Sequence, residues 1–357
     1  IKKMKISLPK NLLETILTNC QNFLDKRDRS QITSHIYFEV QENIFILKAT
    51  DYEIYLESHI NIPSIEQGNA TANGRQMLDS IKYLKDGEVT IETTNQDSIQ
   101  ISQGKSKTKL PMFNADEFPK FPEYDKNKKL QIESTKFLNS IKNINPAVDT
   151  ASPKYELNGS LLDIKDYGYN FVATDTRRLA IIEYKSQSVD TLSLIIPKKA
   201  INEISKLFID NFEIYHNSTH LIIKNDEYTF YTKLINGKYP DYEKIIPKDF
   251  KYKIALPKDK IIDALQFVKS LANNIKITFK PNEMLFESLN EESGEASTQL
   301  EIQTGIEFLC LGINSKYILD FLSQIDGNEF TLCINEPNTP FVVVNGNFST
   351  VIMPVIL

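Results

Sequence analysis

Hydrophobic residues in this chain recur in amphipathic segments that repeat at domain-sized intervals. A short strand-like opening followed by an apolar helical face begins at Ile6, again at Ile132 and again at Ile254. The apolar residues of each face are spaced by three or four positions, as in helices that bury one side. They are Leu12, Leu13, Ile16 and Leu17; Phe137, Leu138 and Ile141; and Ile261, Ile262, Leu265 and Val268. This self-similarity predicts copies of one structural unit.

A second amphipathic segment follows in each copy, at residues 77–84, 200–207 and 318–325. Each ends in an acidic turn with Gly87, Asn211 or Gly327, and a strand-like run comes next. Glycine and asparagine are the residues that end helices in a left-handed conformation. The pattern therefore predicts three α+β domains, at residues 1–125, 126–248 and 249–357.

Length and composition agree with several domains in a reducing compartment. A chain of 357 residues exceeds what one compact core usually serves. No segment approaches the roughly 20 apolar residues that span a bilayer, and the N-terminus has no apolar signal region. The cysteines, Cys20, Cys310 and Cys333, are odd in number and far apart, which favours buried thiols over disulfides. We expect a cytoplasmic protein.

The formal net charge of −6 argues against a generic nucleic-acid-binding surface. It leaves open a protein that concentrates positive charge on one surface, because a field depends on how charges are distributed.

Catalytic chemistry has little support in the sequence. His216 and His220 have a spacing that could hold zinc on a helix, but they flank a stretch typical of a turn between strands. Residues 104–106 resemble the end of a phosphate-binding loop, yet position 99 is isoleucine where that loop needs glycine. No nucleophile elbow, Cys-x-x-Cys or glycine-rich dinucleotide turn occurs. The sequence favours a binding protein that is not an enzyme and needs no metal or cofactor.

Three motifs together carry a resemblance to a known family. They are Ala173–Ala180 (ATDTRRLA), Gly237–Pro247 (GKYPDYEKIIP) and the terminal Val351–Leu357 (VIMPVIL). In this order, on a threefold repeat of this length, they resemble the bacterial replicative sliding clamp, the beta subunit of DNA polymerase III. The resemblance spans the whole chain.

The resemblance implies an α+β fold with three domains of the DNA-clamp type. In each domain two helices lie against antiparallel sheet, and two chains form a head-to-tail dimeric ring. Such a ring encircles double-stranded DNA and tethers the polymerase III catalytic subunit, the clamp loader and other clamp-binding proteins during replication and repair. Lysines on the polar helix faces fit loose phosphate contacts that permit sliding. By position, the expected DNA contacts are Arg27, Arg75, Lys198 and Lys199.

The resemblance also implies a hydrophobic pocket for partner peptides between the second and third domains. Its expected residues are Leu157, Thr174, Thr176, Arg177, Arg178, Leu179, Pro240, Lys244, Ile245, Asn314, Tyr317, Val351, Met353, Pro354, Val355 and Leu357. Val351–Leu357 can also be interpreted as the last edge strand of the third domain. Both interpretations can hold together, since Pro354 would end strand pairing and free the final residues. Ile356 and Arg177 depart from the family, where arginine and histidine or tyrosine are frequent, so peptide preference is expected to differ.

Ring closure requires contact between the first domain of one chain and the third domain of another. Lysines in the first domain and glutamates in the third offer complementary charge, with an apolar part from nearby residues. The expected interface residues are Lys105, Lys107, Phe267, Leu271, Glu291, Glu292 and Glu295. The connection from Leu271 to the next strand is shorter than the family leads us to expect.

Two other functions remain open at this stage. A scaffold built from the same domains could hold peptides without encircling DNA. An enzyme would need a catalytic cluster assembled from distant residues, and no copy of the repeat is rich in histidine or cysteine.

Overall fold

The computed structural model describes all residues except 1–2, 28–30, 95–96, 124–127, 188–190 and 290–293. The chain forms two compact units. Unit 1 contains residues 1–138 and 202–234, and unit 2 contains residues 139–201 and 235–357. The units therefore do not coincide with the three predicted repeats, because the middle repeat contributes to both.

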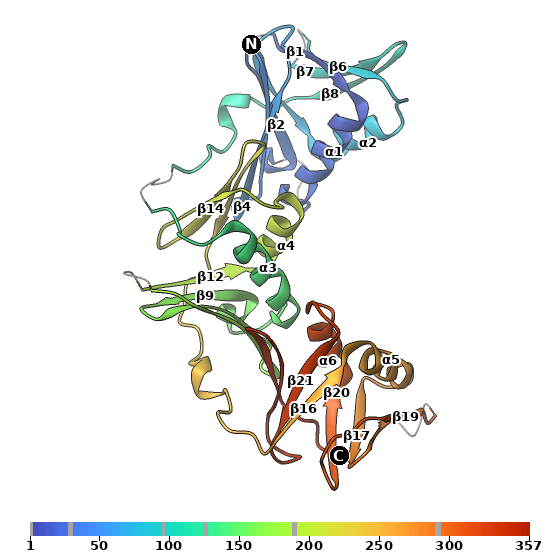
Figure 1. The fold of residues 1–357 in the computed structure, drawn as a ribbon. Coiled ribbons are helices and arrows are strands. Elements are labelled where there is room, and N and C mark those ends of the chain that lie inside the picture. Colours follow the sequence, from blue (N-terminus) through green and yellow to red (C-terminus); the bar gives the residue numbers. More distant parts are fainter. Residues whose placement is uncertain (1–2, 28–30, 95–96, 124–127, 188–190, 290–293) are drawn as a thin grey trace. The chain divides into compact units, whose positions relative to one another are not determined.

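The predicted helices are all present, two in each repeat (Figure 1). They are α1 (Lys10–Cys20), α2 (Gly74–Lys82), α3 (Ser134–Ile144), α4 (Lys198–Leu207), α5 (Lys258–Lys269) and α6 (Ser315–Leu322). The predicted apolar faces are largely buried, for example at Leu13, Ile16 and Leu17 in α1, whereas Leu12 of the same predicted face is 38% exposed. Asn73 and Asn314 cap α2 and α6, since their side-chain oxygens accept from the backbone amides of Gln76 and Lys316.

Unit 1 contains two antiparallel sheets. The four-stranded sheet has the order β1-β6-β7-β8 and the seven-stranded sheet the order β13-β14-β15-β4-β3-β2-β5. Their strands are β1 (Lys5–Pro9), β2 (His35–Val40), β3 (Ile44–Thr50), β4 (Ile54–Asn61), β5 (Gly68–Asn73), β6 (Glu88–Thr93), β7 (Ser98–Gln103), β8 (Ser106–Pro111), β13 (Glu213–His216), β14 (His220–Lys224) and β15 (Tyr228–Lys233).

Unit 2 contains two further antiparallel sheets. Their orders are β12-β9-β10-β11-β23-β22-β21-β16 and β19-β18-β17-β20. The strands are β9 (Gly159–Lys165), β10 (Gly168–Thr174), β11 (Arg178–Lys185), β12 (Leu192–Pro197), β16 (Tyr252–Pro257), β17 (Asn274–Lys280), β18 (Glu283–Ser288), β19 (Ser297–Glu301), β20 (Leu309–Asn314), β21 (Glu329–Ile334), β22 (Phe341–Asn345) and β23 (Phe348–Ile352).

Each long sheet joins strands from two neighbouring repeats. In unit 1, β15 of the second repeat pairs with β4 of the first, with Phe230 opposite Leu56. In unit 2, β23 of the third repeat pairs with β11 of the second, with Thr350 opposite Ala180. The fold thus repeats one rule: β2–β5 of the first repeat continue into β13–β15 of the second, and β9–β12 of the second continue into β16 and β21–β23 of the third.

The predicted turns behave as their residue types require. Gly87, Asn211 and Gly327 follow the second helix of each repeat with φ of 138°, 50° and 89°. These left-handed backbones are the ones that glycine and asparagine adopt at low cost. His216 and His220 end β13 and begin β14, so the predicted hairpin turn between them is confirmed. Residues 104–105 likewise form the turn between β7 and β8.

Candidate partner-peptide groove and nucleic-acid interface

A tight turn at Thr174–Arg178 connects β10 to β11 in unit 2. The Thr174 hydroxyl donates to the carbonyl of Arg178 at 2.6 Å and accepts from the amide of Thr176 at 3.1 Å. The Asp175 carboxylate accepts from the amides of Arg177 and Arg178 at 3.0 and 3.1 Å. Thr176 has φ of 71°, so the turn holds an ordinary residue in the left-handed region. Thr176 and Arg177 are consequently exposed.

The same turn occurs in the first repeat, which explains the shared Ala-Thr-Asp sequence. Thr50 Oγ1 donates to the carbonyl of Ile54, and Asp51 accepts from the amides of Glu53 and Ile54. Tyr52, in the place of Thr176, also has φ of 71°. The hydrogen-bonding side chains Thr and Asp therefore preserve one local geometry in both repeats.

Arg178 is the last residue of this turn, and its buried guanidinium has several partners. Its Nη1 donates to Asp320 Oδ2 in α6 at 2.6 Å, and its Nε donates to Asp175 Oδ2 at 3.1 Å. Nη2 donates to the carbonyl of Pro146, and the Tyr317 ring lies 4.5 Å from the guanidinium carbon. The side chain is 4% exposed. Arg178 thus connects the turn to α6 and is occupied by protein groups.

Residues 239–246 form a second wall of the candidate groove and are held to β9 and β10. The Tyr242 hydroxyl donates to Asp163 at 2.7 Å and accepts from Asn170 at 3.0 Å. Lys165 Nζ and the Tyr167 hydroxyl both donate to Glu243, at 2.5 and 2.9 Å. These two hydrogen bonds lower the pKa of the Glu243 carboxyl.

The next residues along this wall face solvent. Lys244 pairs with Asp241 at 2.7 Å, which raises the pKa of the lysine. Ile245 is 48% exposed, a large apolar surface for a residue outside any core. Pro240 is half-buried beside Tyr239, which is buried. The turn of residues 242–244 therefore buries one side and presents Lys244 and Ile245 on the other.

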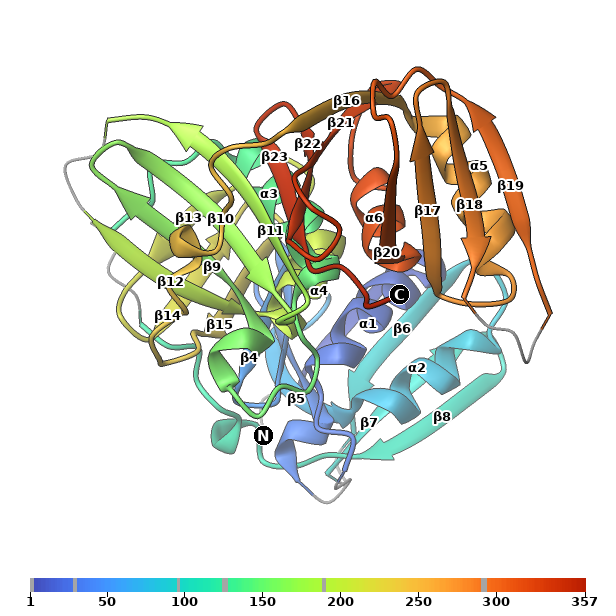
Figure 2. The ribbon, with the colours of Figure 1, turned by 90° about the horizontal axis from the view of Figure 1, so that it is seen from below.

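The C-terminal segment completes the candidate groove. After β23 ends at Ile352, the Met353 amide donates to the carbonyl of Arg177 at 2.9 Å. The Val355 amide then donates to the carbonyl of Gly312 in β20 at 2.8 Å, and the chain end lies beside β20 (Figure 2). The interpretation of Val351–Leu357 as one edge strand is wrong: β23 lies between β22 and β11, and Pro354, which lacks an amide donor, follows its end.

All the residues predicted for the peptide pocket lie in unit 2. Leu157, Leu179 and Val351 belong to one buried apolar cluster. Thr174, Asn314, Tyr317, Pro354 and Val355 are half-buried, whereas Met353 and Leu357 are exposed at 42% and 55%. The arrangement offers an aliphatic floor, exposed apolar edges and a few polar groups, which suits an extended apolar peptide. The assignment of these residues to peptide binding stays a prediction.

The predicted DNA contacts differ in how available their charges are. The side chains of Arg27 and Arg75 are 90% and 75% exposed, and each lies near a carboxylate, Asp25 at 3.3 Å and Asp79 at 3.9 Å. Lys198 is half-buried and donates to the carbonyl of Val148 at 2.7 Å. Burial, followed by the charges of Arg178 and Lys316, lowers the pKa of Lys198. Lys199 is exposed.

The predicted interface residues lie at the ends of two different sheets. Lys105 is in the turn before β8 and Lys107 is within it, and both are exposed. β8 is the last strand of its sheet, and β19 is the last strand of another. Glu295 is exposed just before β19, and Phe267 in α5 is 57% exposed, with Leu271 half-buried after that helix. Glu291 and Glu292 lie outside the described residues.

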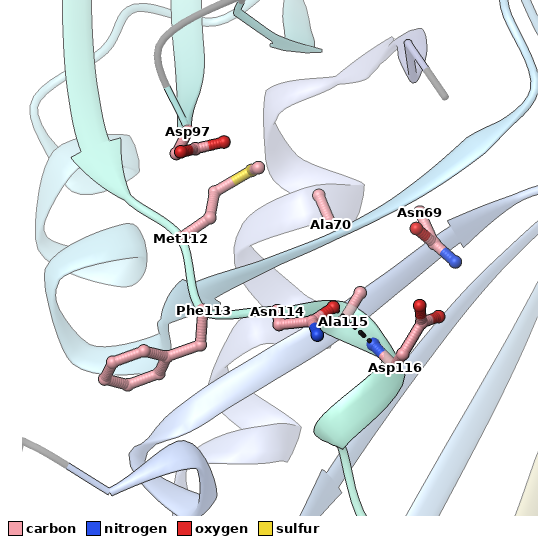
Figure 3. A pocket seen from close by; sticks show the side chains of 8 residues that line it. All are labelled: Asn69, Ala70, Asp97, Met112, Phe113, Asn114, Ala115 and Asp116. Carbon is pink, nitrogen blue, oxygen red and sulfur yellow. Dashed lines mark hydrogen bonds between the residues drawn. The ribbon is translucent and has the colours of Figure 1, made fainter. Parts of the chain in front are cut away.

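A hollow of about 670 Å³ opens elsewhere, in unit 1 (Figure 3). It is lined by Asn69, Ala70, Asp97 and residues 112–116. Asn114 Oδ1 accepts from the Asp116 amide at 3.1 Å, so part of its polar lining is satisfied locally. The lining holds two carboxylates and no basic side chain, and it includes none of the predicted pocket residues.

Two kinds of feature are absent from the part of the chain that the structure describes. No helix is long and apolar enough to cross a membrane. No group of three or more His, Cys, Asp or Glu side chains lies close enough together to hold a metal ion, among the residues whose positions are given. Cys20 and Cys333 are buried and Cys310 half-buried, all as free thiols.

Known proteins that resemble this chain in sequence and in structure belong to one family. Family models for the N-terminal, central and C-terminal domains of the DNA polymerase III beta subunit match residues 4–122, 131–241 and 243–356. Beta sliding clamps of two Helicobacter pylori strains are 39% and 40% identical, covering 99% of this chain and all of theirs. A Staphylococcus aureus beta sliding clamp is 26% identical over 95% of both chains.

Solved structures of beta clamps also match the fold of this chain. The crystal structure of the Helicobacter pylori beta clamp bound to a DNA ligase peptide is 39% identical and covers 99% of this chain and 100% of its own, with a TM-score of 0.93. The DNA polymerase III beta subunit of Pseudomonas aeruginosa, at 24% identity and a TM-score of 0.90, shares the fold over 99% of this chain.

The three-domain α+β fold with paired helices on antiparallel sheets is that of a DNA clamp. The chain belongs to the DNA polymerase III beta subunit family, and its function is that of a bacterial sliding clamp. The predicted fold class and family are confirmed. The exact domain limits at residues 125/126 and 248/249 and the roles of individual residues stay predictions.

Proposed function

We propose that two copies of this chain form a head-to-tail ring that encircles double-stranded DNA and tethers the replicative polymerase. The observation that carries the ring is the pairing rule of the sheets. Within the chain, β4 pairs with β15 and β11 pairs with β23. In the described part of the chain, β19 of the third repeat and β8 of the first are the corresponding strands that end their sheets.

A second copy would supply the missing partner of each edge. In a head-to-tail dimer, β19 of each chain would pair with β8 of the other, which applies the same rule at two further junctions and removes two exposed edges per chain. The exposed charges are complementary, with Lys105, Lys107 and Lys109 along β8 and Glu295 beside β19. Phe267 adds exposed apolar surface to the same proposed contact.

The positive charge for DNA would come from exposed side chains such as Arg27, Arg75 and Lys199. Lys198 is proposed as a weaker contributor, because its ammonium already donates to a backbone carbonyl. A topological link needs few phosphate contacts, so a chain of net charge −6 can retain DNA while sliding on it.

The groove in unit 2 is proposed as the docking site for partner peptides. Its apolar floor and exposed apolar edges support this use, and the related Helicobacter pylori clamp has been solved with a DNA ligase peptide. The polymerase III catalytic subunit, the clamp loader and other clamp-binding proteins are the proposed partners. We propose a protein without catalytic activity, acting in the cytoplasm, where bacterial DNA is replicated.

The test measures the mass of the assembly and then asks whether the assembly is topologically linked to DNA. Sedimentation velocity at micromolar concentration should give twice the chain mass of 41.0 kDa. The protein, loaded by a clamp loader, should then stay on nicked circular DNA through gel filtration and be lost after the circle is cut. Loss that does not depend on cutting would overturn encirclement. A monomer that still binds clamp-binding peptides would favour the alternative, a peptide-binding scaffold that forms no ring.

A further inference from the structure

The C-terminal segment 353–357, which we call the tail, is attached to the rest of unit 2 by two backbone hydrogen bonds. One joins the Met353 amide to the carbonyl of Arg177, and the other joins the Val355 amide to the carbonyl of Gly312. The two acceptors belong to different repeats, Arg177 to the second and Gly312 to the third. The tail therefore links the second repeat to the third, among the residues predicted for the peptide pocket.

The second attachment depends on the absence of a side chain at Gly312. A Cβ atom built on this residue would lie 2.3 Å from the carbonyl oxygen of Val355 and 3.1 Å from Leu357 Cγ. The first distance is far shorter than van der Waals contact permits, and a backbone oxygen cannot move away without breaking the attachment. The φ of Gly312 is not in the left-handed range, so glycine is required here by the close approach of the tail.

The position of Gly312 in the sheet explains why its carbonyl is available. β20 is the last strand of the sheet β19-β18-β17-β20, and Gly312 pairs with Lys276 on its inner side. The tail uses the outer side of this strand at one point, as a short added strand would. Asn314, two residues later, caps α6, the helix that carries Tyr317 and Asp320.

A fixed tail matters because it carries the exposed apolar surface of the groove. Met353, Ile356 and Leu357 are 42%, 90% and 55% exposed. A tail that is already ordered presents this surface without the entropy cost of immobilising it when a peptide binds. A tail released from β20 would have to be ordered again by every partner.

We propose that Gly312 is a positioning residue for partner binding: it allows the tail to dock on β20 and so holds the groove in its binding-competent form. Gly312 touches the tail and acts on the peptide through it. The effect on peptide affinity rests on the proposed function of the groove, whereas the docking of the tail does not.

The test uses Gly312→Ala in the full chain and two separate measurements. Digestion by a C-terminal exopeptidase, followed by intact-mass spectrometry, reports whether the tail is docked. Fluorescence anisotropy with a labelled DNA ligase-derived clamp-binding peptide reports affinity. Gly346→Ala is the matched control: Gly346 has φ of 58°, so alanine is strained there, but nothing lies within 4 Å of its Cβ position.

We expect the exopeptidase to remove residues 355–357 from Gly312→Ala at least fivefold faster than from the unmodified protein. We also expect this variant to bind the peptide at least tenfold more weakly. Gly346→Ala should match the unmodified protein in both measurements while melting at a lower temperature. This control separates loss of tail docking from general loss of stability.

Three results would overturn the proposal in different ways. Unchanged digestion of Gly312→Ala would mean that the tail does not depend on Gly312. Faster digestion with unchanged peptide affinity would mean that docking does not position the groove, while the proposed function stands. Absence of peptide binding by the unmodified protein would overturn the proposed function and, with it, the role of Gly312 in binding.

Discussion

The guanidinium of Arg178 and the carboxylate of Asp320 join the second repeat to the third, with 2.6 Å between Nη1 and Oδ2. The contact is buried on the arginine side and is reinforced by Asp175 and by the Tyr317 ring. It fixes the start of β11 against α6, the helix that follows β20. Its first role is therefore structural, although the residue was predicted as part of the peptide pocket.

Replacing Arg178 with methionine should destabilise the chain by about 3 kcal/mol, because the substitution leaves Asp320 and the carbonyl of Pro146 without their buried partner. Urea unfolding measures the change. Lys316→Met is the control, since Lys316 also pairs with Asp320 but is 52% exposed, so its removal should cost less than about 1 kcal/mol. Equal losses in the two variants would contradict this account.

Removing the tail at residues 353–357 should weaken binding of clamp-binding peptides by about 100-fold, because the exposed apolar edge of the groove is lost. Fluorescence anisotropy measures the affinity. The fold and the dimer should persist, since β23 ends at Ile352 and the proposed dimer contact uses other strands. Retained affinity would show that the groove lies elsewhere.

Reversing the charges of Lys105 and Lys107 to glutamate should raise the dissociation constant of the proposed dimer by about tenfold or more, through repulsion from acidic residues near β19. Sedimentation over a dilution series measures it. The control is the double charge reversal of Lys251 and Lys253. Both lysines are exposed, Lys251 directly before β16 and Lys253 within it, and β16 also ends a sheet. A dissociation constant that stays the same in the first variant would exclude β8 from the contact.

His35 should make stability depend on pH in mildly acidic solution. Burial lowers the pKa of this imidazole to about 4, against about 6.5 for an exposed histidine. Between these values the unfolded chain binds a proton that the folded chain does not, so stability falls as the pH drops from about 6.5 towards 4. The Thr71 hydroxyl lies 3.3 Å from Nδ1, and the Phe113 ring packs against the imidazole.

The variant His35→Asn removes this titration while keeping a polar group near Thr71. Its urea midpoint should change less between pH 7 and pH 5 than that of the unmodified protein. Parallel pH profiles for the two proteins would contradict the assignment of the slope to His35.

Much of the fold could be predicted because local sequence determines it. The apolar spacing that starts at Ile6, Ile132 and Ile254 located three of the helices, and the residues after the second helices marked their ends. The Ala-Thr-Asp sequence marked a turn whose hydrogen bonds are made by its own side chains, at Thr50 and at Thr174. In the third repeat, β18 ends at Ser288 and β19 begins at Ser297, and the Ala-Thr-Asp sequence does not occur there.

Other features could not be predicted, because they arise between distant segments. Nothing in β15 indicates that it pairs with β4 of another repeat rather than with its own. The sequence does not distinguish Arg177, which is exposed, from its neighbour Arg178, which is buried against α6. The need for glycine at position 312 cannot be predicted from local sequence, since it is explained only by a tail that lies 40 residues or more further along the chain.

The pairing of β4 with β15 and of β11 with β23 means that the repeats of the sequence are out of phase with the compact units of the structure. A fragment cut at the limits of the middle repeat would contain two part-sheets, β9–β12 and β13–β15, each stripped of its neighbour and bearing a bare strand. Bare strands of this kind recruit one another into aggregates. A middle repeat expressed alone would thus be expected to associate with copies of itself through these strands.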